Sequence, residues 1–256
     1  MRVIQISDCH LQTDPLAELK GIRTQETLER VLRDIEERYP TIDRLVITGD
    51  LTHDERATTY EFLSRRLTGW RERLRVLPGN HDDRELLAEQ FADRVERVAG
   101  RVVFWEEGEH WSLVGLDSHW PGNTAGELGA EQLGWLKERL SASLSRRPSS
   151  SVCLFLHHPP VSVGSPWLDQ IGLRDGAELG ALLAQFPAAR LVCCGHIHQE
   201  RVVGARGFTL LTCPSTGVPF RAETERLEVD QRLRVGYRIL DFFSAGEFHS
   251  RVERLA

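Results

Sequence analysis

The chain has 256 residues, of which 41% are hydrophobic and 27% are charged, as in a globular protein with one large α/β domain or two small ones. Its formal net charge is −6, with 38 acidic and 32 basic residues, and it has no basic block of the kind that nucleic-acid-binding proteins carry. No apolar run is long enough to span a membrane, and the first residues form a strand-like pattern instead of a signal peptide. We therefore expect a cytoplasmic protein with no nucleic-acid partner and no membrane partner.

The five cysteines lie mostly inside apolar runs. An odd number of cysteines without a regular framework is typical of free thiols in a reducing compartment. This pattern agrees with the expected cytoplasmic location.

The first predicted strand covers residues 3–6, where apolar and polar side chains alternate. Asp8 and His10 follow it, and because they are two positions apart their side chains share one face of an extended chain. A carboxylate and an imidazole in this arrangement can bind one metal ion, whereas a polar turn after the strand is the alternative interpretation.

A helix is predicted over residues 24–39, where apolar residues recur at helical spacing, and Pro40 ends it. A second strand, rich in β-branched residues, covers 44–48 and leads to Gly49 and Asp50. An aspartate after a glycine is often a turn residue or a helix N-cap. The carboxyl ends of strands in open α/β sheets are, however, also where ligands bind.

A second helix is expected to begin near Asp54, with His53 in the turn before it. His53 could line a site, but we expect it in a solvated turn. A third strand over residues 74–77 leads into a Pro-Gly turn, from which Asn80 and His81 emerge. Asn80 offers a carbonyl oxygen to a metal, and His81 is a candidate proton donor.

Further elements follow from the same periodicities. Helices are expected over 83–95, 133–144 and 178–186, and strands within 102–116 and over 208–211, 237–243 and 248–252. Asp117, Ser118 and His119 follow one of these strands and could approach the site, but we expect them to lie outside it.

The strand predicted over 152–156 is fully apolar and ends in His157, the first of two adjacent histidines, before two prolines that prevent its continuation. Residues 161–176 form an irregular loop, of a length that is often functional. One more buried strand then ends in His196 and His198.

Five buried strands thus end in groups that can bind a metal or move a proton: Asp8 and His10, Asp50, Asn80 and His81, His157, and His196 and His198. Each buried polar group needs a partner, and a shared metal centre would satisfy them together. The set is too large for one tetrahedral zinc ion and suits two ions that share a bridging carboxylate. A structural zinc site with Cys193 and Cys194 is disfavoured, because adjacent residues of a strand point to opposite faces.

In their order along the chain, these motifs resemble the five motifs of the calcineurin-like metallophosphoesterase superfamily: Asp8-Cys9-His10, Gly49-Asp50, Gly79-Asn80-His81-Asp82, His157 and Gly195-His196-Ile197-His198. The resemblance implies one domain over residues 1–256. It also implies an α/β fold, a four-layer α/β/β/α sandwich of two mixed sheets with flanking helices and a dinuclear metal site at the carboxyl ends of the strands.

The resemblance further assigns roles to the motif residues. The first ion would be held by Asp8, His10 and His198, the second by Asn80, His157 and His196, and both by a bridging Asp50. Substrate would contact Asn80, His81 and His198. The two ions would be divalent or trivalent iron, manganese or zinc, because the donor set is too hard for copper(I) and too rich in nitrogen for calcium.

A narrower resemblance points to the bacterial class III 3',5'-cyclic AMP phosphodiesterases. It is carried by residues 167–173, Trp-Leu-Asp-Gln-Ile-Gly-Leu, and by 236–238, Gly-Tyr-Arg. Asp175 stands where that group implies an asparagine, and Val235 where it implies a proline. An acidic side chain near an anionic substrate could change which phosphodiester is accepted.

We therefore expect a metal-dependent phosphodiesterase that hydrolyses a 3',5'-cyclic nucleotide, with cyclic AMP as the favoured substrate and AMP as the product. A hydroxide that bridges the ions would attack phosphorus, His81 would protonate the leaving oxygen, and Asp82 would hold the imidazole of His81. The alternatives are a glycerophosphodiesterase, a broad phosphomonoesterase and phosphodiesterase, or a non-catalytic interaction module of the same fold. The expected partner is a small phosphodiester, and the expected assembly is a monomer or a homodimer.

Overall fold

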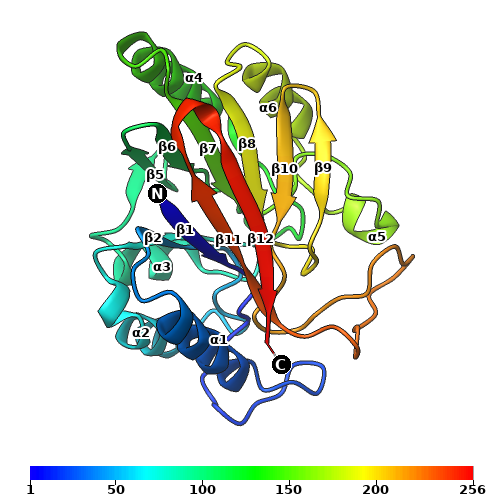
Figure 1. The fold of residues 1–256 in the computed structure, drawn as a ribbon. Coiled ribbons are helices and arrows are strands. Elements are labelled where there is room, and N and C mark those ends of the chain that lie inside the picture. The colour runs from blue at the N-terminus through cyan, green and yellow to red at the C-terminus, as the bar shows by residue number, and fades with distance from the viewer. Residues whose placement is uncertain (256) are drawn as a thin grey trace.

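The computed structural model describes residues 1–255, and two β-sheets form its centre (Figure 1). The first sheet has the strand order β12-β11-β1-β2-β3 and the second the order β4-β5-β6-β7-β8-β10-β9. The strands of the first sheet are β1 (Arg2–Ile6), β2 (Arg44–Thr48), β3 (Leu74–Leu77), β11 (Gly236–Phe242) and β12 (Phe248–Arg254). Those of the second are β4 (Glu96–Val98), β5 (Arg101–Glu107), β6 (Trp111–Gly115), β7 (Ser151–Leu156), β8 (Ala189–Cys194), β9 (Val202–Ala205) and β10 (Phe208–Thr212).

Both sheets are mixed. In the first, β1, β2 and β3 are parallel, whereas β11 and β12 pair antiparallel. In the second, β6, β7, β8 and β10 are parallel, and β4, β5 and β9 add antiparallel pairs at the two edges. The parallel strands of each sheet therefore deliver their carboxyl ends to one edge.

The helices cover the outer faces of the sheets, as Figure 1 shows for α1 beside β1 and β2 and for α4 and α6 beside β7 and β8. They are α1 (Thr24–Arg38), α2 (Ala57–Arg66), α3 (Arg84–Gln90), α4 (Gly129–Arg146), α5 (Pro166–Asp169) and α6 (Gly176–Leu183), with short 3₁₀ turns at Thr68–Trp70 and Ser244–Gly246. No helix in residues 1–255 is both long enough and apolar enough to cross a membrane.

Three apolar clusters separate the layers. One joins α1, α2 and α3 to the first sheet, and a second joins α4, α5 and α6 to the second sheet. The third contains side chains of both sheets and lies between them. The predicted four-layer α/β/β/α sandwich is therefore confirmed.

The alternation along β1 shows how the sequence builds these layers. Val3 belongs to the cluster between the sheets, whereas Ile4 and Ile6 belong to the cluster under the helices. Gln5 also points between the sheets, where its amide donates to Thr48 Oγ1 at 2.9 Å and to a carbonyl of β8. Successive residues of a strand face opposite sides, so β1 lies between the two apolar clusters. The buried amide of Gln5 shows that the space between the sheets becomes polar towards the carboxyl ends of the strands.

Several element boundaries differ from the prediction. The second helix begins at Ala57 because the carboxylate of Asp54 accepts hydrogen bonds from Thr13 of a neighbouring loop and from the amide of Arg56. The helix expected over 83–95 ends at Gln90. The short elements β4, β9 and α5 were not predicted; each has three or four residues, too few for a periodic pattern.

Candidate metal centre

Polar side chains leave both sheets at the same edge. From the first sheet come Asp8 and His10 after β1, Asp50 after β2, and Asn80 and His81 after β3; from the second come His157 after β7 and His196 and His198 after β8. The side chains of Asp8, His10, Asp50, His157, His196 and His198 are buried, with exposed fractions of 0 to 5%, whereas His81 is partly exposed. The sheets therefore meet at a shared polar site, as the sequence predicts.

Asp8, His10, Asp50 and His198 form a first group, whose donor atoms all lie within 4.8 Å of one another. His10 Nε2 lies 3.1 Å from His198 Nε2 and 3.4 Å from Asp50 Oδ2. His198 Nε2 lies 3.3 Å from Asp8 Oδ1.

A second group gathers around His157. Its Nε2 lies 3.3 Å from Asn80 Oδ1, 3.3 Å from His196 Nδ1 and 3.4 Å from Asp50 Oδ1. One oxygen of Asp50 thus faces each group, which is the geometry of a carboxylate that can bridge two ions.

These residues fit two metal ions. His157 Nδ1 donates to the carbonyl of Thr48 at 2.7 Å and His198 Nδ1 to the carbonyl of Val218 at 2.5 Å, so the Nε2 lone pairs of both rings face the site. Ligands that bind one ion at about 2.0–2.2 Å stand about 3.0–3.6 Å apart in tetrahedral or octahedral geometry, and the distances between the donor atoms fall in this range.

The protonation states of three ligands favour cation binding, whereas two others hold a proton that an ion would have to displace. Burial lowers the pKa of His196 and of His198 to about 3, so both rings are neutral ligands at pH 7. Burial alone would raise the pKa of Asp50, but the neighbouring His157 and His10 hold it well below its usual value. Metal ions bind deprotonated ligands, and Asp50 is ionised. Burial lowers the pKa of His157 but the ionised Asp50 raises it to about 9, and burial raises the pKa of Asp8 to about 7.

The backbone of the site is unusual. Five of these residues have positive φ angles in the left-handed region: Asp8 (55°), His10 (47°), Asp50 (50°), His196 (69°) and His198 (55°). Such conformations are sparsely populated by residues other than glycine and concentrate at functional sites. They turn each side chain out of its strand direction and towards the shared centre.

Two glycines allow the close approach of these loops. A Cβ atom at Gly49, whose φ is +90°, would overlap the ring of His157, and one at Gly79 would overlap the carboxylate of Asp50. The motif glycines therefore make room for the ligands of the second group.

Comparison with known proteins identifies the family. The family model described as calcineurin-like phosphoesterase matches residues 1–200. The chain belongs to the calcineurin-like phosphoesterases. As a member of this family, it is a metal-dependent hydrolase of phosphoric esters.

Relatives of this phosphoesterase extend over its full length. The 3',5'-cyclic adenosine monophosphate phosphodiesterase CpdA of Escherichia coli K12 is 35% identical over 100% of this chain and 90% of its own length. A probable cyclic nucleotide phosphodiesterase of Synechococcus is also 35% identical, over 98% of this chain and 91% of its own. Among solved structures, a dimetal phosphatase of Danio rerio matches 97% of this chain and 98% of its own with a TM-score of 0.65 and 14% identity, which shows the fold alone.

Asp82 does not make the expected contact with His81. Its carboxylate accepts hydrogen bonds from the amides of Leu51, Thr52 and Gly79 and from the hydroxyl of Tyr60. Within residues 1–255 no hydrogen bond joins the side chains of Asp82 and His81. Asp82 instead joins the loop after β3 to the loop after β2, and that it orients the imidazole of His81 stays a prediction.

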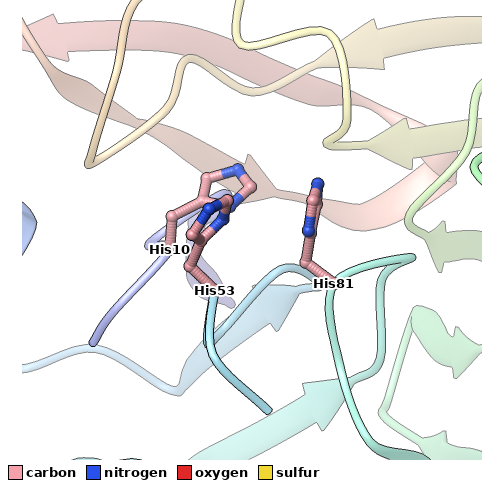
Figure 2. Close-up of side chains that lie close together, drawn as sticks. All are labelled: His10, His53 and His81. Atoms are coloured by element: carbon pink, nitrogen blue, oxygen red, sulfur yellow. The ribbon is translucent and has the colours of Figure 1, made fainter. Parts of the chain in front are cut away.

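His53 lies in the phosphoesterase site and not in a solvated turn. Figure 2 shows it together with His10 and His81; its ring centroid lies 5.6 Å from that of His10 and 4.9 Å from that of His81. Burial, together with His81, lowers the pKa of His53, so the ring is neutral at pH 7. The signal in the sequence was its place three residues after Asp50, in a loop that leaves the site edge.

Two other residues that the sequence singled out, His158 and Asp175, form hydrogen bonds with neighbouring loops. His158, next to His157, contacts Ser118 Oγ at 2.8 Å and the carbonyl of Thr124 at 3.2 Å with its two ring nitrogens. Asp175 accepts hydrogen bonds from the amides of Leu128 and Gly129 at the start of α4. Its carboxylate therefore holds a helix end, a role that the sequence did not indicate.

Proposed function

We propose that this phosphoesterase hydrolyses a 3',5'-cyclic nucleotide, with cyclic AMP as the favoured substrate and AMP as the product. Curated relatives at 30 to 35% identity over the whole chain carry this activity in their names. The observation in the structure that supports it most is the position of Asp50, with one carboxylate oxygen towards each group of donors. A phosphodiester anion bound beside this carboxylate needs the positive charge of two ions.

The proposed ligand sets follow the two groups. Asp8, His10 and His198 would hold one ion, Asn80, His157 and His196 the other, and Asp50 both. The imidazole nitrogens together with the carboxylate and amide oxygens suit iron, manganese or zinc. When bound, two such ions polarise the phosphoryl oxygens and supply an activated water near neutral pH.

We assign proton donation to His81. Its side chain is partly exposed, and its ring lies 5.1 Å from that of the proposed ligand His10, beside the first ion. Its backbone amide donates to Asp50 Oδ1 at 2.9 Å, which fixes the loop that carries it. From this place the imidazole would protonate the ribose 3'-oxygen as it leaves, while Asn80 and His198 border the phosphoryl group.

We further propose that the whole chain forms one domain and that the protein works in the cytoplasm. It would act as a monomer or a homodimer, with a small molecule as its substrate. The apolar cluster shared by both sheets supports one domain. The five buried free cysteines support a reducing compartment.

The test is a substrate panel for the metal-loaded enzyme. We expect kcat/KM to be highest for cyclic AMP, lower for cyclic GMP, and lowest for glycerophosphocholine and 4-nitrophenyl phosphate. A higher value for glycerophosphocholine would favour a glycerophosphodiesterase, and activity on no phosphodiester at all would favour a non-catalytic module.

A further inference from the structure

The aromatic side chains of Trp167 and Phe220 meet beside the metal centre, although they are far apart in the sequence. Their ring centroids lie 5.6 Å apart, at an interplanar angle of 58°. Trp167 belongs to α5 within the loop predicted over 161–176, and both side chains are partly buried. Neither residue has a part in the metal centre as described so far.

Phe220 connects this pair to the site. Its ring lies parallel to the imidazole of His198, at 3.8 Å and 5°, and His198 Nε2 lies within 3.1 Å of His10 Nε2. A continuous row of flat rings therefore runs from a proposed metal ligand through Phe220 to Trp167. His198 covers one face of Phe220, which leaves the edge and the other face of Phe220 and the ring of Trp167 as the aromatic groups on this side of the centre.

The contact between the two rings is not reinforced by polar contacts. Within residues 1–255, no hydrogen bond or ion pair joins segment 162–174 to segment 213–235. On one side, Asp169 accepts from the amide of Val163 and holds the α5 turn. On the other, Phe220 pairs with Val229 in an isolated bridge. Each ring thus belongs to a segment with its own hydrogen bonds. A flat ligand that enters between the two rings would break the contact between the rings but no hydrogen bond or ion pair between the segments.

Trp167 also carries an unused donor. Its indole Nε1 is buried and has no hydrogen-bond partner, and tryptophan can only donate. A buried donor without a partner is unfavourable.

The other walls of the site suit a base less well. On the side of the first ion, His53 and His81 present imidazole rings (Figure 2). On the side of Asn80 there is a cavity of about 550 Å³, whose lining includes the carboxylates of residues 55, 82, 83 and 85 together with Arg84 and His119. A polar, acidic cavity favours water and hydroxyl groups, whereas the uncharged face of a purine gains most from stacking on aromatic rings.

We propose that Trp167 and Phe220 form the nucleobase-binding wall of this phosphoesterase, and so determine its preference for phosphodiesters that carry a purine. This inference rests on the proposed cyclic nucleotide activity and adds the residues that recognise the base. Trp167 is the better residue to test, because it does not touch a proposed metal ligand.

The experiment compares AMP with ribose 5-phosphate, which has the same sugar and phosphate but no base. Both are measured as competitive inhibitors of bis(4-nitrophenyl) phosphate hydrolysis by the metal-loaded enzyme, with metal content checked in each preparation. The variants are Trp167→Leu, which removes the ring, and Trp167→Phe, which keeps a ring but not the donor. Trp135→Leu is the matched control, because Trp135 is a partly buried tryptophan of α4 that packs on Trp105.

We expect wild type to bind AMP more tightly than ribose 5-phosphate. Trp167→Leu should weaken AMP binding by roughly 5- to 150-fold, the range for loss of one stacked base, and leave ribose 5-phosphate binding unchanged. Trp167→Phe should retain most of the preference, and Trp135→Leu all of it. Equal weakening of both inhibitors, or none for AMP, would overturn the proposal.

Hydrolysis of cyclic AMP separates this inference from the proposed function. If wild type hydrolyses cyclic AMP and Trp167→Leu leaves its KM unchanged, the base-binding wall is wrong and the function stands. If wild type does not hydrolyse cyclic AMP, the proposed function is wrong, and the assignment of the wall to a cyclic nucleotide fails with it.

Discussion

The rings of His53 and His81 lie 4.9 Å apart between their centroids, at an interplanar angle of 34°. They come from the loops after two neighbouring parallel strands, β2 and β3. Only His81 belongs to a motif of the family. His53 lies outside the motifs named above and adds a second imidazole beside the proposed proton donor.

Replacement of His81 by alanine should separate proton transfer from metal binding. We expect near-normal metal content but a loss of turnover on cyclic AMP of about two to four powers of ten, if His81 acts as a general acid. The loss should be smaller for a nitrophenyl phosphodiester, because its leaving group is already a stable anion. His110→Ala is the control, since His110 is an exposed histidine. Loss of metal would instead make His81 a ligand.

Replacement of His53 by alanine should have a smaller effect than that of His81. We expect turnover to fall about tenfold, because a ring packed beside the proton donor restricts where the donor points. Both ions should remain bound, since His53 is outside the proposed ligand sets. Measurement of kcat and metal content for the single and double variants checks this; independent effects of the two changes would contradict a role of His53 through His81.

Asp50→Asn should lower metal content and turnover more than replacement of any one ligand that binds a single ion. A neutral amide cannot balance the charge of two ions as a carboxylate does, and the change reaches both groups of donors. We expect metal content and turnover to fall together, as measured by elemental analysis and kinetics. Asp175→Asn is the matched control outside the site. Retention of two ions with near-normal turnover would refute the bridging role.

Replacement of Asp175 should affect stability and not specificity. Its carboxylate receives the amides of Leu128 and Gly129 at the start of α4, so Asp175→Ala should lower the free energy of unfolding by about 0.5–2 kcal/mol, as for loss of a helix cap. Asp175→Asn keeps one acceptor oxygen and should be milder. The ratio of kcat/KM for cyclic AMP to that for cyclic GMP should be the same in both variants as in wild type. A changed ratio would indicate that Asp175 contacts the substrate.

The sequence predicted most of the strands and the donor set because both depend on short patterns, whereas the four layers were implied by the resemblance to the family. Apolar runs such as residues 152–156 marked buried strands, and the groups that follow them had to meet at one edge of the sheets. What it could not show were contacts between loops: the amides that receive Asp82, the helix end held by Asp175, and the approach of His53 to His81. Such contacts depend on how separate segments pack, which no local periodicity records.

Each proposed ion would take ligands from both sheets, with Asp8 and His10 opposite His198 in one set and Asn80 opposite His157 and His196 in the other. An ion held in this way would link the two sheets of the sandwich. Ligands that bind only the native state stabilise it by about 2.7 kcal/mol when present at a hundred times their dissociation constant. In a cell short of these metals, the apoprotein would unfold more often and meet proteases more often. Metal supply would then control how much of this phosphoesterase exists, in addition to how fast it works.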